Sequence, residues 1–330
     1  MTLPPGPDRE SWQRDFEQLM RDDPGGAADA LLVLWPDVEA DTEMVDMLRA
    51  NTEALLRNGS DAIWAEGLHP VVFRAGNSLS HQGLLPAATT FWESLLPVAS
   101  GRLGSDHADT LTITNNLLWA YGRGGDPDRA LTGFRDLLAL RVRVLGPDHE
   151  NTLATRHAVA TWQDATGDHP GAAAAMRSLV SDYERTLGPD HRDTLNTRIA
   201  LVEILGPADP AAAVAELRPL LDDFRRVLGA DHPEVLEVEV ELASWLAEAG
   251  DFDEALSRVD RLLDDYDRVL GPAHHDTLTL RFLAADMRAR AGRQREATEA
   301  MHSLHGDVVG LINQGRREVE DLRTSIESWS

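Results

Sequence analysis

Apolar residues recur at helical spacing through most of the chain, and short segments rich in glycine, proline and aspartate separate these apolar runs. Residues 134–138 (FRDLL) and 259–263 (VDRLL) are two such runs at equivalent places. One nine-residue opening occurs five times between the runs: LGSDHADTL from Leu103, LGPDHENTL from Leu145, LGPDHRDTL from Leu187, LGADHPEVL from Leu228 and LGPAHHDTL from Leu270. The openings begin 42, 42, 41 and 42 residues apart. A fixed period of this length, filled with helix-forming sequence, predicts one helical hairpin that is copied and stacked.

Two small residues keep the same register in the copies when positions are counted from the first leucine of each opening. Position 23 is a glycine that should end the first helix in a left-handed conformation, namely Gly83, Gly125, Gly167, Gly250 and Gly292. Position 28 is an alanine that should let the paired helices approach closely, namely Ala88, Ala130, Ala172, Ala255 and Ala297. The copy at 187–227 is one residue shorter, and Gly206-Pro207 stands near its turn. The aspartates and threonines of the openings are expected to cap the following helix.

These patterns predict an all-α fold, a right-handed superhelical solenoid of about six hairpins with helical caps. The hairpin copies are expected near 61–102 (a degenerate copy), 103–144, 145–186, 187–227, 228–269 and 270–302. Residues 1–60 should form an N-terminal helical cap, with 1–8 disordered and helices over 9–22, 27–34 and 41–58, the last ended by Gly59. Residues 303–330 should form a C-terminal capping helix that is interrupted at Gly315.

The 42-residue period and its openings resemble the kinesin-light-chain type of tetratricopeptide repeat, in the arginine-rich form common in actinobacteria. Residues 112–131, TITNNLLWAYGRGGDPDRAL, carry the asparagine pair, tyrosine, glycine and alanine of that family, and the resemblance covers 61–305. The asparagine pair occurs once, as Asn115-Asn116, whereas later copies place other residues there. The resemblance implies a binding scaffold whose first helices line a concave groove.

The charge balance narrows the classes of partner. The net charge is −25 and the isoelectric point is about 4.7, so nucleic acids and anionic membranes would be repelled on average. All 31 basic residues are arginines, which excludes a phosphate-loop or Schiff-base lysine. The absence of cysteine excludes thiol nucleophiles and zinc-thiolate sites. The N-terminus does not have the pattern of a secretory signal and no apolar run would span a bilayer, so we expect a cytoplasmic protein.

Repeated histidines and charges have structural interpretations. The opening histidines recur once per copy, too far apart along a solenoid to share one metal ion, and the local pair His302/His305 lacks a third ligand, so we expect no metal and no cofactor. Aspartates three residues before arginines, as in Asp182/Arg185, should form surface ion pairs. Arginines at position 12 (Arg156, Arg198 and Arg281) could line a cationic track, or could pair with acidic residues of a neighbouring second helix.

The resemblance places positions 13, 17, 20 and 21 of the first helices on the concave surface. In the first three copies it therefore gives these candidate partner-binding residues: Asn77, His81, Asn115, Trp119, Arg123 and His157. Exposed aromatic and arginine residues are typical anchors of protein interfaces. Alternatively, the N-terminal helices fill the groove and these residues pack internally. The later copies place Glu203, Ser244, Glu248 and Asp286 there, a more acidic lining.

Three functions remain open on these observations. The first is a non-enzymatic scaffold that binds a protein or peptide segment in its groove. The second is a sensor or regulatory arm of a signalling or transcriptional system that acts on another chain or a small ligand. The third is an enzyme, or an enzyme subunit, with a pocket in the groove; no catalytic motif supports it.

Overall fold

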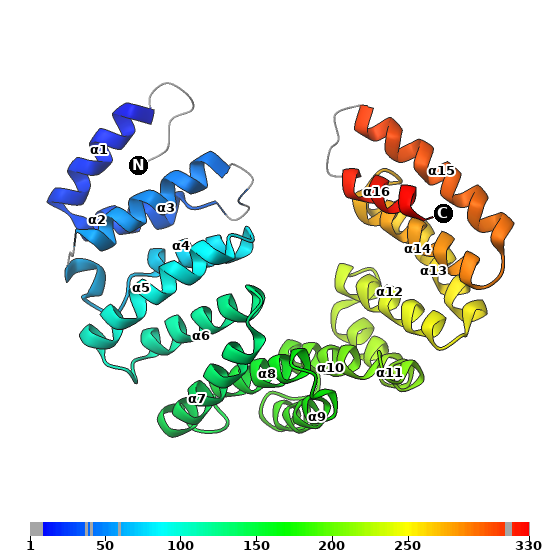
Figure 1. The fold of residues 1–330 in the computed structure, drawn as a ribbon, viewed down its shortest axis with the longest axis horizontal. Coiled ribbons are helices and arrows are strands. Elements are labelled where there is room, and N and C mark those ends of the chain that lie inside the picture. Colours follow the sequence, from blue (N-terminus) through cyan, green and yellow to red (C-terminus); the bar gives the residue numbers. More distant parts are fainter. Residues whose placement is uncertain (1–8, 37–38, 40–41, 59–60, 314–318, 330) are drawn as a thin grey trace. The chain divides into compact units, whose positions relative to one another are not determined.

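A computed structural model describes residues 9–36, 39, 42–58, 61–313 and 319–329. In these residues the chain forms sixteen α-helices and one short 3-10 helix, with no β-strand. The helices form two compact units, residues 1–168 (unit 1) and 169–330 (unit 2). Within each unit, helices that are consecutive in the sequence lie side by side (Figure 1). The all-helical, hairpin-based fold that the repeat predicts is therefore confirmed.

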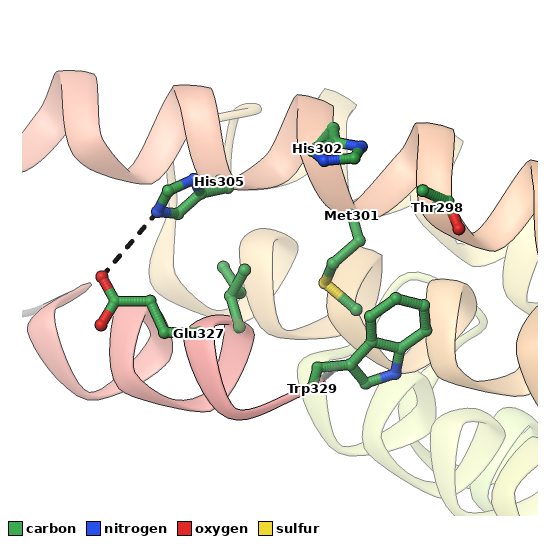
Figure 2. A pocket seen from close by; sticks show the side chains of 7 residues that line it. Thr298, Met301, His302, His305, Glu327 and Trp329 are labelled. Atoms are coloured by element: carbon green, nitrogen blue, oxygen red, sulfur yellow. Dashed lines mark ion pairs between the residues drawn. The ribbon is translucent and has the colours of Figure 1, made fainter.

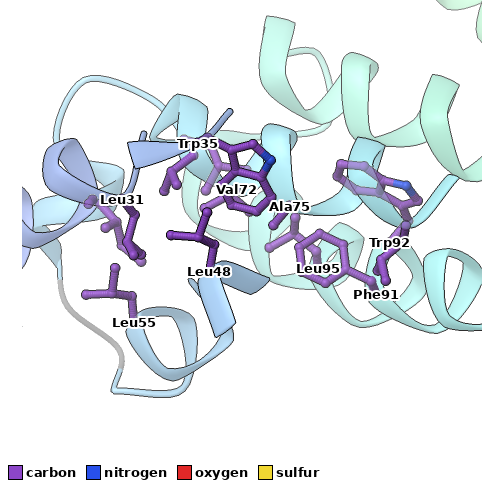
Figure 3. Packing of buried hydrophobic residues seen from close by; sticks show 14 of the residues in the cluster. Leu31, Trp35, Leu48, Leu55, Val72, Ala75, Phe91, Trp92 and Leu95 are labelled. Atoms are coloured by element: carbon purple, nitrogen blue, oxygen red, sulfur yellow. The ribbon is translucent and has the colours of Figure 1, made fainter. Parts of the chain in front are cut away.

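Unit 1 begins with three helices that precede the repeats: α1 (Arg9–Asp22), α2 (Pro24–Leu34) and α3 (Thr42–Arg57). They agree closely with the helices that the apolar spacing predicts in this region. Figure 3 shows the buried cluster that they share with the first hairpin, in which Leu31, Leu48 and Trp92 are fully buried. The predictions for residues 1–8 and for Gly59 lie outside the described residues.

Helices α4 to α15 follow the repeat, two for each copy, and α16 comes after the last copy. Unit 1 contains α4 (Pro70–His81), α5 (Leu85–Leu103), α6 (Ala108–Arg123), α7 (Pro127–Leu145) and α8 (Glu150–Ala165). Unit 2 contains α9 (His169–Thr186), α10 (Arg192–Leu205), α11 (Pro210–Leu228), α12 (Pro233–Glu248), α13 (Phe252–Val269), α14 (His275–Arg290), α15 (Gln294–Asn313) and α16 (Glu320–Ser328). The even-numbered helices α4 to α14 are the first helices of the successive copies.

The glycine turns and the alanine contacts form as the repeat predicts. Gly125, Gly167, Gly250 and Gly292 have φ angles of 99°, 93°, 89° and 79°, a region that side chains disfavour. The alanines at position 28 have no exposed surface: Ala88, Ala130, Ala172, Ala255 and Ala297. Gly206 differs, since its φ is −55° and it continues the helical backbone at the end of α10.

The opening histidines, rather than the expected aspartates and threonines, cap the first helices. The Nδ1 atom of each accepts a hydrogen bond from the backbone N–H two residues later, in His107, His149, His191, His232 and His274. His69 caps α4 in the same way, although the first copy has lost the opening motif. The prediction failed because an imidazole nitrogen can replace the carboxylate or hydroxyl oxygen that usually accepts this bond. Aspartates do cap second helices, as Asp126 caps α7.

The C-terminal region is one long helix followed by a short one. Helix α15 continues past residue 302, where a separate capping helix was expected to begin, as far as Asn313. Val319, Leu322 and Ile326, the latter two on α16, bury their side chains in a cluster with Leu304 and Val308 of α15. The predicted interruption at Gly315 lies outside the described residues.

Candidate functional site

The six candidate partner-binding residues lie on three successive first helices of unit 1: Asn77 and His81 on α4, Asn115, Trp119 and Arg123 on α6, and His157 on α8. We call this surface the unit 1 face. His81 and Arg123 are exposed, whereas the other four side chains are half-buried. Half-buried polar groups beside an exposed imidazole and an exposed guanidinium are a suitable composition for recognising a partner by hydrogen bonds.

Amide side chains connect α4 and α6 on this face. Asn116 Nδ2 donates to Asn77 Oδ1 at 3.0 Å, and Asn115 Nδ2 donates to Asn116 Oδ1 at 3.4 Å. His157 lies one helix further along, and its Nδ1 is 3.4 Å from the hydroxyl of Thr161. Asn116 is absent from the predicted set because its position was not assigned to the concave surface, but its neighbour Asn115 could have signalled it.

The Trp119 side chain packs against other aromatic side chains of the scaffold. Its ring lies 5.6 Å from that of Phe134 on α7, edge to face, and 5.3 Å from that of Trp162 on α8. Trp162 in turn packs over Gly122 of α6, where an added Cβ would lie 2.3 Å from the indole ring. These ring contacts favour the alternative in which Trp119 packs internally, although the side chain is only half-buried, so a role of Trp119 in binding a partner stays a prediction.

Arg141 of α7 lies behind the amides and is only 4% exposed. Its guanidinium donates to Thr155 Oγ1 at 2.6 Å and to the carbonyl oxygen of Asn151 at 3.0 Å, both on α8. Longer contacts reach the carbonyl of Leu111 at 3.4 Å and Asn115 Oδ1 at 3.5 Å on α6. Burial lowers the pKa of Arg141. Sequence reasoning did not single out this residue.

The N-terminal region contacts α4 beside the unit 1 face, through Ser78 and the following Gln82 rather than through Asn77 or His81. Arg49 of α3 donates to Ser78 Oγ at 3.0 Å and to Gln82 Oε1 at 3.1 Å. Glu39 accepts from the same two side chains at 2.7 and 3.2 Å. Burial opposes ionisation of Glu39, but hydrogen bonds from Ser78 and Trp35 and the nearby arginines outweigh it and lower its pKa. His81 stays exposed, so these contacts leave that end of the face open.

The corresponding surface of unit 2 is acidic. A cavity of about 540 Å³ on this surface is lined by Glu203 of α10 and by Glu237 and Glu241 of α12. Burial raises the pKa of Glu241, the nearby carboxylate of Glu203 raises it further, and a hydrogen bond from Trp245 partly offsets both effects. Desolvation also raises the pKa of Glu203, although the residue as a whole is exposed.

Two of the acidic residues expected in this lining already contact other side chains of the same chain. Asp286 of α14 accepts a hydrogen bond from the indole of Trp329 at 3.2 Å. Glu248 pairs with Arg290 at 2.8 Å. Figure 2 shows the nearby pocket of about 270 Å³ between α15 and α16, where His302 and His305 lie apart and His305 Nε2 is 3.9 Å from Glu327 Oε1. Within the described parts of the chain, no three histidine or acidic side chains form a group that could hold a metal ion.

The repeated charges pair within the scaffold. Arg185, Arg226 and Arg268 bind the aspartates three residues before them, as the spacing predicts. Arg198 pairs with Asp223 at 2.7 Å and Arg281 with Asp307 at 2.7 Å, each on the second helix of the same hairpin. These two contacts favour the ion-pair interpretation of position 12 over a cationic track.

Antiparallel helical pairs that recur every 42 residues, with small residues at the turn and at the helix contact, define a helical-repeat scaffold. Family models of the tetratricopeptide repeat match residues 110–151, 152–193 and 234–301. The repeats over these residues are tetratricopeptide repeats. No curated protein matches the chain.

Solved structures share this fold at low sequence identity. A single-substitution variant of a Podosopora anserina putative kinesin light chain with nearly identical TPR-like repeats is 21% identical, with a TM-score of 0.56 over 62% of this chain and 96% of that one. BtubC (BKLC) from P. vanneervenii is 15% identical, with a TM-score of 0.54 over 73% and 92%. The apo form of RapI is 11% identical, with a TM-score of 0.54 over 95% and 94%. At these identities the likeness concerns the fold alone.

Proposed function

We propose that this chain is a non-enzymatic scaffold that binds a protein or peptide segment on the unit 1 face. The observation that carries the proposal is the row of polar side chains over α4, α6 and α8, in which Asn77 and Asn116 join two first helices while His81 and Arg123 remain exposed. A surface that extends over three helices fits an extended segment better than a compact small molecule.

Rigid repeats make such binding favourable. The face is already ordered by buried contacts, such as those of Trp119 with Phe134 and Trp162, so association does not need to order the scaffold. The groups on the face are amides, imidazoles and a guanidinium, which recognise backbone and side-chain oxygens by hydrogen bonding.

Among the helices that the structure describes, none is long and apolar enough to cross a membrane.

A comparison of captured proteins tests the proposal. The full chain and the variant Asn77→Ala/His81→Ala/Arg123→Ala are immobilised and exposed to lysate of the source organism, with quantification by isotope-labelled mass spectrometry. We expect at least one protein whose capture falls by about tenfold or more on the variant. The matched control Arg135→Ala/Arg143→Ala, which changes exposed arginines of α7, should retain that protein.

Circular dichroism separates binding from folding in this experiment, since all three chains should have equal helical content. If every captured protein is retained by the variant, the partner-binding surface is not the unit 1 face and the proposal fails.

A further inference from the structure

Arg141 is a buried cation without an acidic partner. Its guanidinium donates to carbonyl, hydroxyl and amide oxygens, all of them neutral, and its Nε has no hydrogen-bond partner. Among the described residues, none of the ion pairs of unit 1 involves Arg141. A buried charge that is not neutralised by a counter-ion is costly, so this arrangement is unfavourable for stability alone.

The other copies solve the same packing problem without a charge. Arg141 stands at position 39, near the end of the second helix. Once the missing residue of the copy at 187–227 is allowed for, the equivalent residues are all apolar or aromatic and all buried: Ala99, Tyr183, Phe224, Tyr266 and Val308. The scaffold therefore has no general need for arginine at this position, and the copy that departs from the pattern is the one that carries Asn115 and Asn116.

The arginine fixes the direction of the amide contacts. A guanidinium can only donate, so Asn115 presents its Oδ1 to Arg141, at 3.5 Å. Asn115 Nδ2 then donates to Asn116 Oδ1, and Asn116 Nδ2 donates to Asn77 Oδ1. The first contact is long for a hydrogen bond, but a buried charge still orients an amide dipole at this distance. Each amide thus accepts from the side of Arg141 and donates away from it, and the N–H groups of Asn77 end the series.

We infer that Arg141 is a positioning residue that orients these amides as donors, so that the unit 1 face selects a partner segment carrying a carboxylate side chain. This inference rests on the proposed function of the same face. Donor groups backed by an unneutralised cation match the oxygens of a carboxylate, which would supply the missing negative charge. The chain as a whole carries a net charge of −25, so selecting an acidic segment requires such a local positive source.

The test uses random linear peptides displayed on phage, selected on the immobilised full chain. The best selected peptide and its counterpart, with each Asp or Glu replaced by Asn or Gln, are then synthesised and measured by fluorescence polarisation. We expect an acidic residue at one fixed position among the selected peptides. The carboxylate form should bind the native chain about tenfold more tightly than the amide form.

Variants of Arg141 show whether this residue causes the preference. Arg141→Phe introduces the residue type that the copy at 187–227 has at the equivalent position, Phe224. This change should reduce the carboxylate preference to within about twofold. Its melting temperature should be equal or higher, because it removes a buried charge. Arg141→Lys keeps a charged donor and should retain most of the preference. Arg135→Gln removes one exposed charge from the same helix and should leave the preference unchanged. If Arg141→Phe does not fold, Arg141→Met replaces it in the same comparison.

The outcomes separate this inference from the proposed function. If peptides are selected and bind the face but show no acidic preference, or if the preference is unchanged in Arg141→Phe, the inference is wrong and the proposed function stands. If selected peptides bind the Asn77→Ala/His81→Ala/Arg123→Ala variant as well as they bind the native chain, the proposed function fails, and the inference fails with it.

Discussion

The first helices of the two units present different chemistry on the same scaffold. In unit 1, the amides of Asn77, Asn115 and Asn116 are oriented from a buried arginine. In unit 2, the equivalent surface of α10 and α12 carries Glu203 and Glu241, whose pKa values are raised. The turn glycine, the contact alanine and the histidine cap that hold each hairpin together occur in both units, whereas the residues on the two faces differ.

The shared positions show what the hairpin needs. A fully buried alanine, a glycine turn with positive φ and a histidine cap occur in both units. A glycine–tryptophan contact also occurs in each, between Gly122 and Trp162 and between Gly206 and Trp245, with an added Cβ 2.3 Å from the indole ring in both cases. The units are therefore expected to respond alike to changes in packing and differently to changes of charge on their faces.

The largest expected effect tests the shared packing. Gly122→Val in unit 1 and Gly206→Val in unit 2 should each lower the free energy of unfolding by about 3 kcal/mol, because the new side chain overlaps the tryptophan ring. Urea denaturation followed by circular dichroism measures the loss. The controls are Gly101→Val and Gly306→Val, at helical glycines where an added Cβ meets nothing within 4 Å. A marked difference between the two tryptophan-contact variants would show that the units do not share this contact in solution.

An intermediate effect is expected at the histidine caps. His149→Ala and His232→Ala should each cost about 1 kcal/mol, because each leaves a backbone N–H of the first helical turn without its acceptor. His149→Asn and His232→Asn should recover most of the loss, since asparagine can also accept this bond. Thermal melts of the native chain with and without a chelator should coincide; a chelator-dependent melting temperature would instead indicate a metal site at these histidines.

The smallest effect tests the difference between the faces. The raised pKa of Glu241 means that the folded chain binds this proton more tightly than the unfolded chain, so the native stability falls as pH rises through that pKa. Glu241→Gln should therefore stabilise the chain by up to about 1 kcal/mol at neutral pH. The gain should vanish below the ordinary glutamate range, where both states are protonated. Thermal melts of both chains across this pH range measure it.

The paired carboxylate Glu254 provides a control of opposite sign for that experiment. Hydrogen bonds from Arg218 lower its pKa to about 2, with a further contribution from Arg258. Its pairing therefore adds stability above the ordinary glutamate range, and that contribution is lost as the pH falls toward 2. Glu254→Gln should not stabilise the chain at neutral pH. If both glutamine variants stabilise the chain equally, burial does not destabilise the ionised carboxylate of Glu241 in the folded chain.

Local sequence determined the helices of this chain and their pairing. Three signals act within a single hairpin: the helical spacing of apolar residues, the glycine at position 23 and the alanine at position 28. Because the hairpin is repeated, the sequence contains each signal several times. The repeat register also placed all six candidate residues of the unit 1 face on the first helices where they are found.

Only the tertiary structure decided how those side chains are used. Whether Trp119 is an anchor or a core residue depends on Phe134 and Trp162, which belong to other helices. Whether Arg141 is solvated or buried depends on α6 and α8 closing over it, and the direction of the amide contacts follows from that burial. Periodicity specifies which residues share a helix face, whereas burial, charge pairing and hydrogen-bond direction arise from groups that meet across helices.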